Sequence, residues 1–281
     1  MFSRAPATSA NLGPGFDTLA VALGLYVEVT LEPAEVFEIS SEGCGAGLFD
    51  DENHLAARVA CSVLGHTNFA LHVSSTIPVS RGLGSSAALA VAAAAAAGAS
   101  DPLGVAARLD GHAENAAASV LGGLVVARVE GDSVVARSLA LDDVWRFVVV
   151  VPDQELATSD ARRALPERVL FSDAVHNLSA LGLLIAGLGD HDKFVASSMQ
   201  DVLHQPYRAE LLPFADKLLG TLRDAGAAGS CWSGAGSSIL GLVTSEYAPA
   251  VARSAQQFLD SRSIPGEVFT LDADRAGLVT R

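Results

Sequence analysis

The feature that most constrains this chain is a glycine loop that leads directly into a run of alanines. Residues 82–86 read Gly-Leu-Gly-Ser-Ser, and alanine dominates residues 87–97. Because alanine is the best helix former, these alanines are predicted to form a helix, with the two serines at its N-terminus as caps. Free backbone amides and the positive end of the helix dipole bind anions, and the glycines would let a phosphate approach. The sequence therefore predicts a phosphate-binding loop; the plainer alternative is a glycine turn that caps a buried helix.

Three other phosphate-binding patterns fit this loop poorly. A Walker A loop needs Gly-Lys-Ser/Thr, whereas the chain has only two lysines, Lys193 and Lys217, each directly after an aspartate. A Rossmann fingerprint needs a third glycine where Ala87 stands. The sequence also lacks the V-A-I-K and H-R-D segments that accompany the glycine loop of protein kinases. These three classes are therefore set aside.

The charge of the chain argues against nucleic acids and anionic membranes as partners. Its 281 residues carry 18 Lys and Arg against 32 Asp and Glu, a net charge of −14, whereas phosphate backbones are held by clustered basic residues. Residues 87–99 are too short and too weakly apolar to span a bilayer, and residues 1–10 lack the apolar stretch of a signal peptide. Cys44, Cys61 and Cys231 are widely spaced and fit reduced thiols, so we expect a cytoplasmic location.

The hydrophobic pattern indicates an α+β chain of two domains. Strands are predicted over residues 21–31, 35–40, 70–77, 124–129, 134–139, 147–151, 238–243 and 267–271, and helices over 53–64, 102–119, 172–187, 193–202, 213–225 and 248–261. Gly24 is a candidate bulge in the first of these strands. Helices dominate after Pro152, so we place a soft boundary near residue 150, between domains 1–150 and 151–281.

Several segments resemble, in the same order, motifs of the GHMP kinases and, among them, of the homoserine kinase family. Residues 7–17 are similar to the opening P-A-S-x-A-N-L-G-P-G-F-D, and residues 78–87 to P-x-x-x-G-L-G-S-S-A. Further matches are residues 110–115 with E-G-H-x-D-N, 158–166 with T-x-x-A-R-x-x-L-P, 201–208 with D-R-L-H-x-P-Y-R, and 233–236 with S-G-A-G. The glycine loop marks only the superfamily, whereas the opening and the two arginine motifs resemble homoserine kinases specifically.

Four positions depart from these motifs. Asp110 stands for a glutamate and Glu114 for an aspartate, so both carboxylates are kept with a changed reach. Val202 stands for an arginine, and Ser237 for the proline after G-A-G. Mevalonate kinase, galactokinase and diphosphocytidyl-methylerythritol kinase all have a lysine in their opening motif, and no lysine stands near Asn11. The resemblance to those three families is therefore weaker.

The resemblance implies a two-domain α+β fold, with a first domain like domain 2 of ribosomal protein S5 and a ferredoxin-like second domain. It implies an enzyme of threonine biosynthesis, with a homodimer as one option, that transfers the γ-phosphoryl group of ATP to the side-chain hydroxyl of L-homoserine with the help of Mg²⁺. The residues that would bind ATP are Asn53, Pro78, Val79, Ser80, Arg81, Gly82, Leu83, Gly84, Ser85, Ser86 and Ala87. Ser86 and Asp110 would hold Mg²⁺, which prefers oxygen ligands. The plainer alternatives are an N-cap for Asn53 and a solvated acid for Asp110.

The two arginines in these motifs are the candidates for the charged end of the substrate. Homoserine is a zwitterion with a primary hydroxyl, so its site needs cations for the carboxylate and an anion or amide for the ammonium group. Arg162 and Arg208 suit the carboxylate, because a guanidinium binds it in a bidentate manner. We expect both in loops that flank helices of the second domain. The plainer alternative is an exposed arginine in a surface ion pair, against which the position in the motif argues.

The remaining candidates would surround the amino group and the hydroxyl. By resemblance, Asn11 and Asp17 bind the amino and hydroxyl end of the substrate. His112 and Asn115, three residues apart on one helix, would lie beside the substrate, and Thr158 would position the hydroxyl. The plainer alternatives are turn residues, helix packing, a surface amide and an ordinary loop threonine.

By resemblance, Asn11, Asp17 and Asn115 are the expected catalytic residues, nearest to the reacting hydroxyl. Phosphoryl transfer needs mainly in-line positioning and charge neutralisation. The related mevalonate kinase uses an aspartate as base, whereas the amide of Asn115 cannot accept a proton. Either Asp17 or Glu114 takes the proton, or a γ-phosphate oxygen does. Two other functions stay open at this point: a kinase for a different small alcohol, and a ligand-binding protein without activity.

Overall fold

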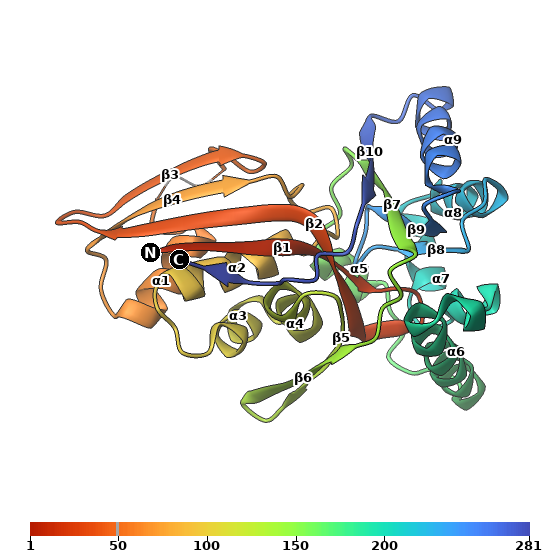
Figure 1. The fold of residues 1–281 in the computed structure, drawn as a ribbon, viewed down its shortest axis with the longest axis horizontal. Coiled ribbons are helices and arrows are strands. Elements are labelled where there is room, and N and C mark those ends of the chain that lie inside the picture. The colour runs from red at the N-terminus through yellow and green to blue at the C-terminus, as the bar shows by residue number, and fades with distance from the viewer. Residues whose placement is uncertain (49–50) are drawn as a thin grey trace.

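The chain folds into two β-sheets with helices packed against them (Figure 1). The computed structural model describes residues 1–48 and 51–281 and contains a seven-stranded and a four-stranded sheet. Strands and helices mix in both halves of the sequence, so the predicted α+β class is confirmed. The three cysteines are free, as expected.

The first sheet is built around two long antiparallel strands. Its strands are β11 (Val279–Thr280), β1 (Phe2–Asn11), β2 (Gly15–Pro33), β4 (Phe69–Ser75) and β3 (Glu38–Gly43), with β5 (Leu124–Glu130) paired to β2 and β6 (Ser133–Leu139) paired to β5. The sequence pattern missed β1 because its alanines, serines and proline are weak strand formers. The register between β1 and β2 shifts at Pro6 and Ala7, opposite Gly24, so the predicted bulge is confirmed.

Four helices cover this sheet: α1 (Leu55–Leu64), α2 (Ser85–Ala96), α3 (Pro102–Asp110) and α4 (Ala113–Leu121). The alanine-rich α2 is almost entirely buried, because its small side chains let strands and helices approach it closely. The N-cap of α2 is Gly84, so the expected serine caps are wrong: Ser85 and Ser86 form its first turn, and no side chain in the described residues caps it. The single helix expected over 102–119 is broken at Gly111, which ends α3 with a φ of 78°.

The second sheet has the order β10 (Gly266–Leu271), β7 (Trp145–Pro152), β9 (Ile239–Thr244), β8 (Gly229–Trp232), with α8 (Ala215–Asp224) and α9 (Ala248–Ser261) packed on it. Between β7 and β8 run α5 (Thr158–Arg163), α6 (Phe171–Gly189), α7 (Gln205–Arg208) and three short 3₁₀ helices, η1 (His191–Lys193), η2 (Ala196–Met199) and η3 (Ala209–Leu211). The helix expected over 193–202 is therefore wrong. Phe194 is extended there and packs edge-on against Trp145, with ring centroids 5.2 Å apart, so tertiary packing overrides the helical pattern.

Helix α6 of the second domain has several exposed apolar side chains. Its 19 residues are long and apolar enough to cross a membrane by length and composition, and 28% of its apolar stretch is buried within the fold. The side chains of Phe171 and Leu178 are 85% and 70% exposed. The expected lack of a membrane partner and the optional homodimer both stay predictions.

The two sheets meet along a seam that the chain crosses more than once (Figure 1). After β10 in the second sheet, the chain returns to the first, where β11 pairs with β1 beside the N-terminus. In the seam, Gly234 N–H donates to the Ala10 carbonyl at 3.0 Å, and Ser238 N–H donates to the Arg81 carbonyl at 3.2 Å. Strand β7 already belongs to the second sheet, and the exact domain boundary near residue 150 stays a prediction.

Candidate active site

A cavity of about 540 Å³ opens where the two sheets meet, at the N-terminal end of α2. Its walls come from the β1–β2 turn, the glycine loop, the α3–α4 junction, α5, α7 and the loop after β8. The predicted site residues that line it are Asn11, Asp17, Val79, Ser80, Gly82, Gly84, Ser85, Ser86, Ala87, Asp110, His112, Asn115, Thr158, Arg162 and Arg208. Segments from residue 11 to residue 208 thus meet in one place.

The glycine loop is packed into the seam as well as open to the cavity. Gly82 has a φ of 74°, and a Cβ there would overlap the Ser233 carbonyl oxygen and lie 2.8 Å from the Gly236 carbonyl oxygen. Gly84 has a φ of 62°, and its Cβ would overlap Thr8 Oγ1. From the sequence, these glycines were expected to let a phosphate approach the backbone closely. The structure adds that the protein's own packing excludes a side chain at both positions.

Four residues that were predicted to bind ATP do not line the cavity that the described residues form. They are Asn53, Pro78, Arg81 and Leu83. Arg81 donates to the Pro152 carbonyl at 2.9 Å and so ties the loop to the end of β7. Leu83 is buried in the core. Asn53 bonds to Asp51, and His54, not Asn53, is the N-cap of α1. A role for these residues in ATP binding stays a prediction.

Asn11, the last residue of β1, and Asp17, near the start of β2, flank the β1–β2 turn at the second domain. Both have positive φ angles, 72° and 51°, a conformation that Asn and Asp tolerate better than most residues. Asn11 Nδ2 donates to the Gly234 carbonyl at 2.8 Å, and Asn11 Oδ1 accepts from the Asp17 N–H at 3.0 Å. Both oxygens of the Asp17 carboxylate accept from the Arg162 guanidinium, at 2.9 and 3.0 Å. This bidentate ion pair raises the pKa of Arg162 and joins the two domains across the cavity.

Arg208 lies deeper than Arg162 and is only 3% exposed. Its Nε donates to the Ala161 carbonyl at 3.2 Å, and its Nη1 donates to the Gly234 carbonyl at 3.1 Å and to His204 Nδ1 at 3.2 Å. Burial lowers the pKa of Arg208 to about 10, so it still carries its charge at neutral pH. These contacts fix the guanidinium in one orientation.

The two arginines share an aromatic neighbour. The guanidinium carbons of Arg208 and Arg162 lie 5.3 and 5.8 Å from the centre of the Phe16 ring, within the range of a cation–π contact. The expectation that both arginines lie in loops is wrong, since Arg162 is inside α5 and Arg208 is the last residue of α7. Two cations therefore converge on one side of the cavity from rigid elements. Phe16 was not among the predicted site residues, although it belongs to the opening motif of residues 7–17.

Asn115 is held by both of its amide atoms. Its Oδ1 accepts from Thr8 Oγ1 at 2.7 Å, and its Nδ2 donates to Glu114 Oε1 at 3.0 Å. Glu114 lines the cavity but is only 4% exposed, and burial raises the pKa of its carboxyl group. A carboxyl group with a raised pKa beside a reaction centre suits proton transfer. Thr158 lines the same cavity as the first residue of α5.

Asp110 and Ser86 bring oxygen ligands to the same cavity. Asp110 is the last residue of α3, and its Oδ2 lies 3.2 Å from His112 Nδ1, a contact that raises the pKa of His112. Asn115 is in the first turn of α4, but His112 is the N-cap residue that precedes the helix, so the expectation that both lie within one helix is wrong for His112. A carboxylate and a hydroxyl are the donor types that Mg²⁺ prefers, so this pair fits the cation.

Beside the glycine loop the cavity continues into an apolar part, which was not predicted from the sequence. Its side chains come from β2, β4, α1, α2 and the loop after β3, and include Val27, Leu48, Leu55, Val73 and Leu89. In the sequence these residues look like ordinary core positions of strands and helices. Only their meeting beside the glycine loop, which depends on the packing of the sheet, distinguishes them.

Two family models match the chain over these segments. The model of the GHMP kinase N-terminal domain matches residues 53–124, and that of the GHMP kinase C-terminal domain matches residues 174–261. A homoserine kinase of Desulfitobacterium hafniense is 36% identical over 98% of this chain and 97% of that protein. A homoserine kinase of Moorella thermoacetica is 39% identical over 84% of this chain and 85% of that protein. The chain therefore belongs to the GHMP kinases and, within them, to the homoserine kinase family.

Solved structures agree with this assignment. The crystal structure of homoserine kinase from Cytophaga hutchinsonii matches with a TM-score of 0.87 at 29% identity, covering 99% of this chain and 96% of that one. The L. major mevalonate kinase, crystallised with R-mevalonate, matches with a TM-score of 0.75 at 15% identity, covering 98% and 96%. The second likeness concerns the fold alone. The resemblance inferred from the sequence motifs is thus confirmed at the level of family and fold.

Proposed function

We propose that this enzyme transfers the γ-phosphoryl group of ATP to the side-chain hydroxyl of L-homoserine, forming O-phospho-L-homoserine and ADP. The observation that carries the proposal is the pairing of two opposite features in one cavity. The N-terminal turn of α2 lies at one end, and the guanidinium groups of Arg162 and Arg208 lie at the other. The first suits phosphates, and the second suits the carboxylate of an amino acid.

The charged groups of the substrate would find partners that the protein already pairs with each other. The Asp17 carboxylate and the Arg162 guanidinium bond to one another in the structure. A zwitterion can exchange this pair, because its ammonium group would bind Asp17 while its carboxylate binds Arg162 and Arg208. The exchange keeps each charge compensated, which limits the cost of desolvation. Asn11, His112, Asn115 and Thr158 would surround the rest of the substrate.

The phosphates of ATP would bind to the backbone amides at the start of α2, and the base would lie in the apolar end of the cavity. Ser86 and Asp110 would hold Mg²⁺. When bound, this cation would neutralise charge on the phosphates. The positions of these residues around one cavity support the assignment.

Three routes for the hydroxyl proton remain in the proposal. Glu114 is buried with a raised pKa, whereas both oxygens of Asp17 are engaged by Arg162; these observations favour Glu114 over Asp17. A γ-phosphate oxygen is the third acceptor. Replacing Glu114 by Gln tests the first route, because loss of a general base lowers kcat by about 100-fold or more. A Gln variant with a kcat within a few-fold of the parent value would exclude Glu114 and leave Asp17 and the phosphate oxygen.

The first test is ADP formation with and without L-homoserine, followed by a panel of small alcohols. We expect strong stimulation by L-homoserine and weak stimulation by the corresponding amino alcohol without a carboxylate. Stimulation by a different alcohol would indicate a kinase of other specificity. ADP formation with none of them, despite tight ATP binding, would indicate a ligand-binding protein without activity.

The proposed metal site has a separate test. Asp110→Ala is expected to raise the Mg²⁺ concentration needed for half-maximal rate by about 10-fold, and to change the KM for L-homoserine much less. Asp132→Ala, which removes an exposed acid in the turn between β5 and β6, is the matched control. An unchanged Mg²⁺ requirement in Asp110→Ala would mean that Asp110 is not a ligand. A cytoplasmic location and a place in threonine biosynthesis would follow from the proposed reaction.

A further inference from the structure

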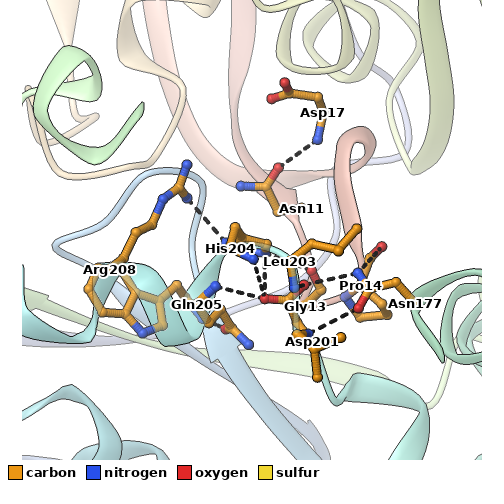
Figure 2. A network of polar contacts seen from close by, with 12 residues as sticks. Asn11, Gly13, Pro14, Asp17, Asn177, Asp201, Leu203, His204, Gln205 and Arg208 are labelled. Atoms are coloured by element: carbon orange, nitrogen blue, oxygen red, sulfur yellow. Dashed lines mark hydrogen bonds and ion pairs between the residues drawn. The ribbon is translucent and has the colours of Figure 1, made fainter. Parts of the chain in front are cut away.

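His204 lies between the two substrate-facing parts of the site, yet the proposed reaction gives it no role. It directly precedes α7, its side chain is fully buried, and its ring stacks on Phe16 with centroids 5.1 Å apart. His204 Nε2 lies 2.8 Å from the Gly13 carbonyl oxygen in the β1–β2 turn, and His204 Nδ1 lies 3.2 Å from Arg208 Nη1 (Figure 2). One imidazole thus bridges the turn that carries Asp17 and the deeper arginine.

The polar neighbours of the ring determine its tautomer. On the Nε2 side, the Asp201 Oδ2 atom, which only accepts hydrogen bonds, also lies 3.5 Å away. The Gly13 carbonyl oxygen can only accept a hydrogen bond, so Nε2 must carry a hydrogen. The Arg208 guanidinium can only donate, so Nδ1 must be unprotonated. A neutral imidazole with its hydrogen on Nε2 satisfies both contacts, and a protonated ring would direct a second N–H at a cation. Burial lowers the pKa of His204, in agreement with a neutral ring.

The position of the ring is fixed from behind by a second buried group. The Asp201 carboxylate accepts from the backbone N–H groups of Leu203, His204 and Gln205, at 3.0, 3.0 and 2.7 Å (Figure 2). It also accepts from Asn177 Nδ2 at 2.9 Å. Four donors on one buried carboxylate leave the segment before α7 little freedom.

We propose that His204 is a positioning residue, whose neutral imidazole sets the Arg208 guanidinium at a fixed distance from the Asn11–Asp17 turn. The carboxylate-binding arginine and the amine-binding turn then hold the spacing that an α-amino acid requires. This inference rests on the proposed function, because it assigns Arg208 to the substrate carboxylate. It concerns the binding of the acceptor and leaves the nucleotide end of the cavity unaffected.

Two variants of His204 each remove one of its two hydrogen bonds, to Arg208 or to Gly13. His204→Gln keeps an N–H near the position of Nε2 and loses the acceptor for Arg208. His204→Asn keeps an oxygen near the position of Nδ1 and loses the bond to Gly13. We expect His204→Gln to raise the KM for L-homoserine about 10-fold or more, since a hydrogen bond to a charged group is lost. We expect a smaller rise for His204→Asn, with kcat and the KM for ATP within about two-fold of the parent in both variants.

An acceptor without a carboxylate distinguishes positioning from a general structural defect. For the amino alcohol analogue of homoserine, His204→Gln should leave KM within about two-fold of the parent value, because this acceptor does not use Arg208. A rise in KM of equal size for both acceptors would overturn the proposal, and so would a parental KM for L-homoserine in a folded variant. His176→Gln, which alters an exposed histidine of α6, is the matched control.

A measurement on the unaltered protein keeps the inference testable if the variants do not fold. The ¹⁵N and ¹H resonances of His204 at neutral pH should report a neutral ring with hydrogen on Nε2, and a ring protonated on Nδ1 would overturn the bridge. If the parent enzyme does not phosphorylate L-homoserine, the proposed function fails on that result alone. The tautomer then still decides whether the bridge to Arg208 exists.

Discussion

The two ends of the cavity are built from different parts of the polypeptide. At the start of α2 the chain offers backbone amides, and within the described residues no side chain caps the helix. At the other end side chains form the binding surface: the Asp17–Arg162 ion pair, and Arg208, which is hydrogen-bonded to His204. The first end depends on backbone conformation and on the absence of a Cβ. The second depends on the chemical identity of each side chain, so the two ends should respond to different kinds of mutation.

The largest effect is expected where a Cβ is added at the backbone end. In Gly82→Ala the new methyl group would overlap the Ser233 carbonyl oxygen while φ stays at 74°. Left-handed strain costs about 1–2 kcal/mol and overpacking about 1–3 kcal/mol, so the free energy of unfolding should fall by about 2–5 kcal/mol. Urea unfolding followed by circular dichroism measures this loss.

Gly65→Ala is the control for that variant. Gly65 ends α1 with a φ of 76°, and a Cβ there would meet nothing within 4 Å in the part of the chain that the structure describes. Only the strain of about 1–2 kcal/mol should remain. If both variants lose the same stability, the seam around the glycine loop is not closely packed, and the contrast between the two ends weakens.

At the side-chain end, Arg208 and Arg162 should differ from each other. Removing a partner from a buried charged pair costs about 2–5 kcal/mol, which is about 30-fold to several thousand-fold in affinity. Arg208→Ala should approach the upper limit, because Arg208 is 3% exposed and bonds to three acceptors. Arg162→Ala should stay near the lower limit, because the side chain of Arg162 is 50% exposed.

Calorimetric titration with L-homoserine and with ATP separates these effects, and ATP affinity should change little in either variant. Arg208→Lys should recover little, because an ammonium group cannot reproduce the guanidinium fork. Equal losses in the two alanine variants would show that burial does not set the contribution of each arginine. A parental KM for L-homoserine in either variant would remove that arginine from the carboxylate site.

Glu114 offers a pH-dependent test of the same end. Burial raises the pKa of its carboxyl group in the folded state above the unfolded value of 4.5. The folded state then holds the proton more tightly, so the contribution of Glu114 to stability is fully present below the unfolded pKa. That contribution is lost as the pH rises through the folded pKa, above which the buried carboxylate destabilises the fold. Glu114→Gln should therefore raise the melting temperature at about pH 8 and change it little at about pH 4.

Thermal unfolding across this pH range, with Glu246→Gln as an exposed control, provides the measurement. A Gln variant whose melting temperature follows the parent at every pH would mean that Glu114 is solvated. The same variant serves the kinetic test of the base, so stability and kcat can be compared in one protein.

The same contrast explains what the sequence could and could not predict. The glycine loop and the alanine helix are local, so their position and the buried helix were predicted from residue type alone. The bond from Asn11 to Gly234 joins residues 223 positions apart, and the pair of Asp17 with Arg162 joins residues 145 positions apart. No local pattern encodes such contacts, and these residues were found only because their motifs resemble those of a known family.

The errors have a related cause. The serine caps were expected from residue preference, but the helix begins at Ser85, two residues before the predicted start at Ala87, and Gly84 takes the N-cap position. The apolar end of the cavity and the bridging role of His204 were not predicted, because buried valines, leucines and a motif histidine carry no sign of what they face. Which face of an element meets a cavity is decided by the packing of the sheets.

The smallest effect is expected for Ser85→Ala, which removes a hydroxyl from the backbone end. Ser85 is in the first turn of α2 and makes no capping bond in the described structure, so the free energy of unfolding should change by less than about 0.5 kcal/mol. Asp101→Ala is the matched comparison, because Asp101 caps α3 by accepting from Gly104 N–H at 2.9 Å; its loss should cost about 1 kcal/mol. If the phosphates bind to backbone amides, the Kd for ATP in Ser85→Ala should stay within about two-fold of the parent value. A ten-fold weaker Kd would show that the serine hydroxyl binds ATP, and the phosphate end would then share the side-chain chemistry of the other.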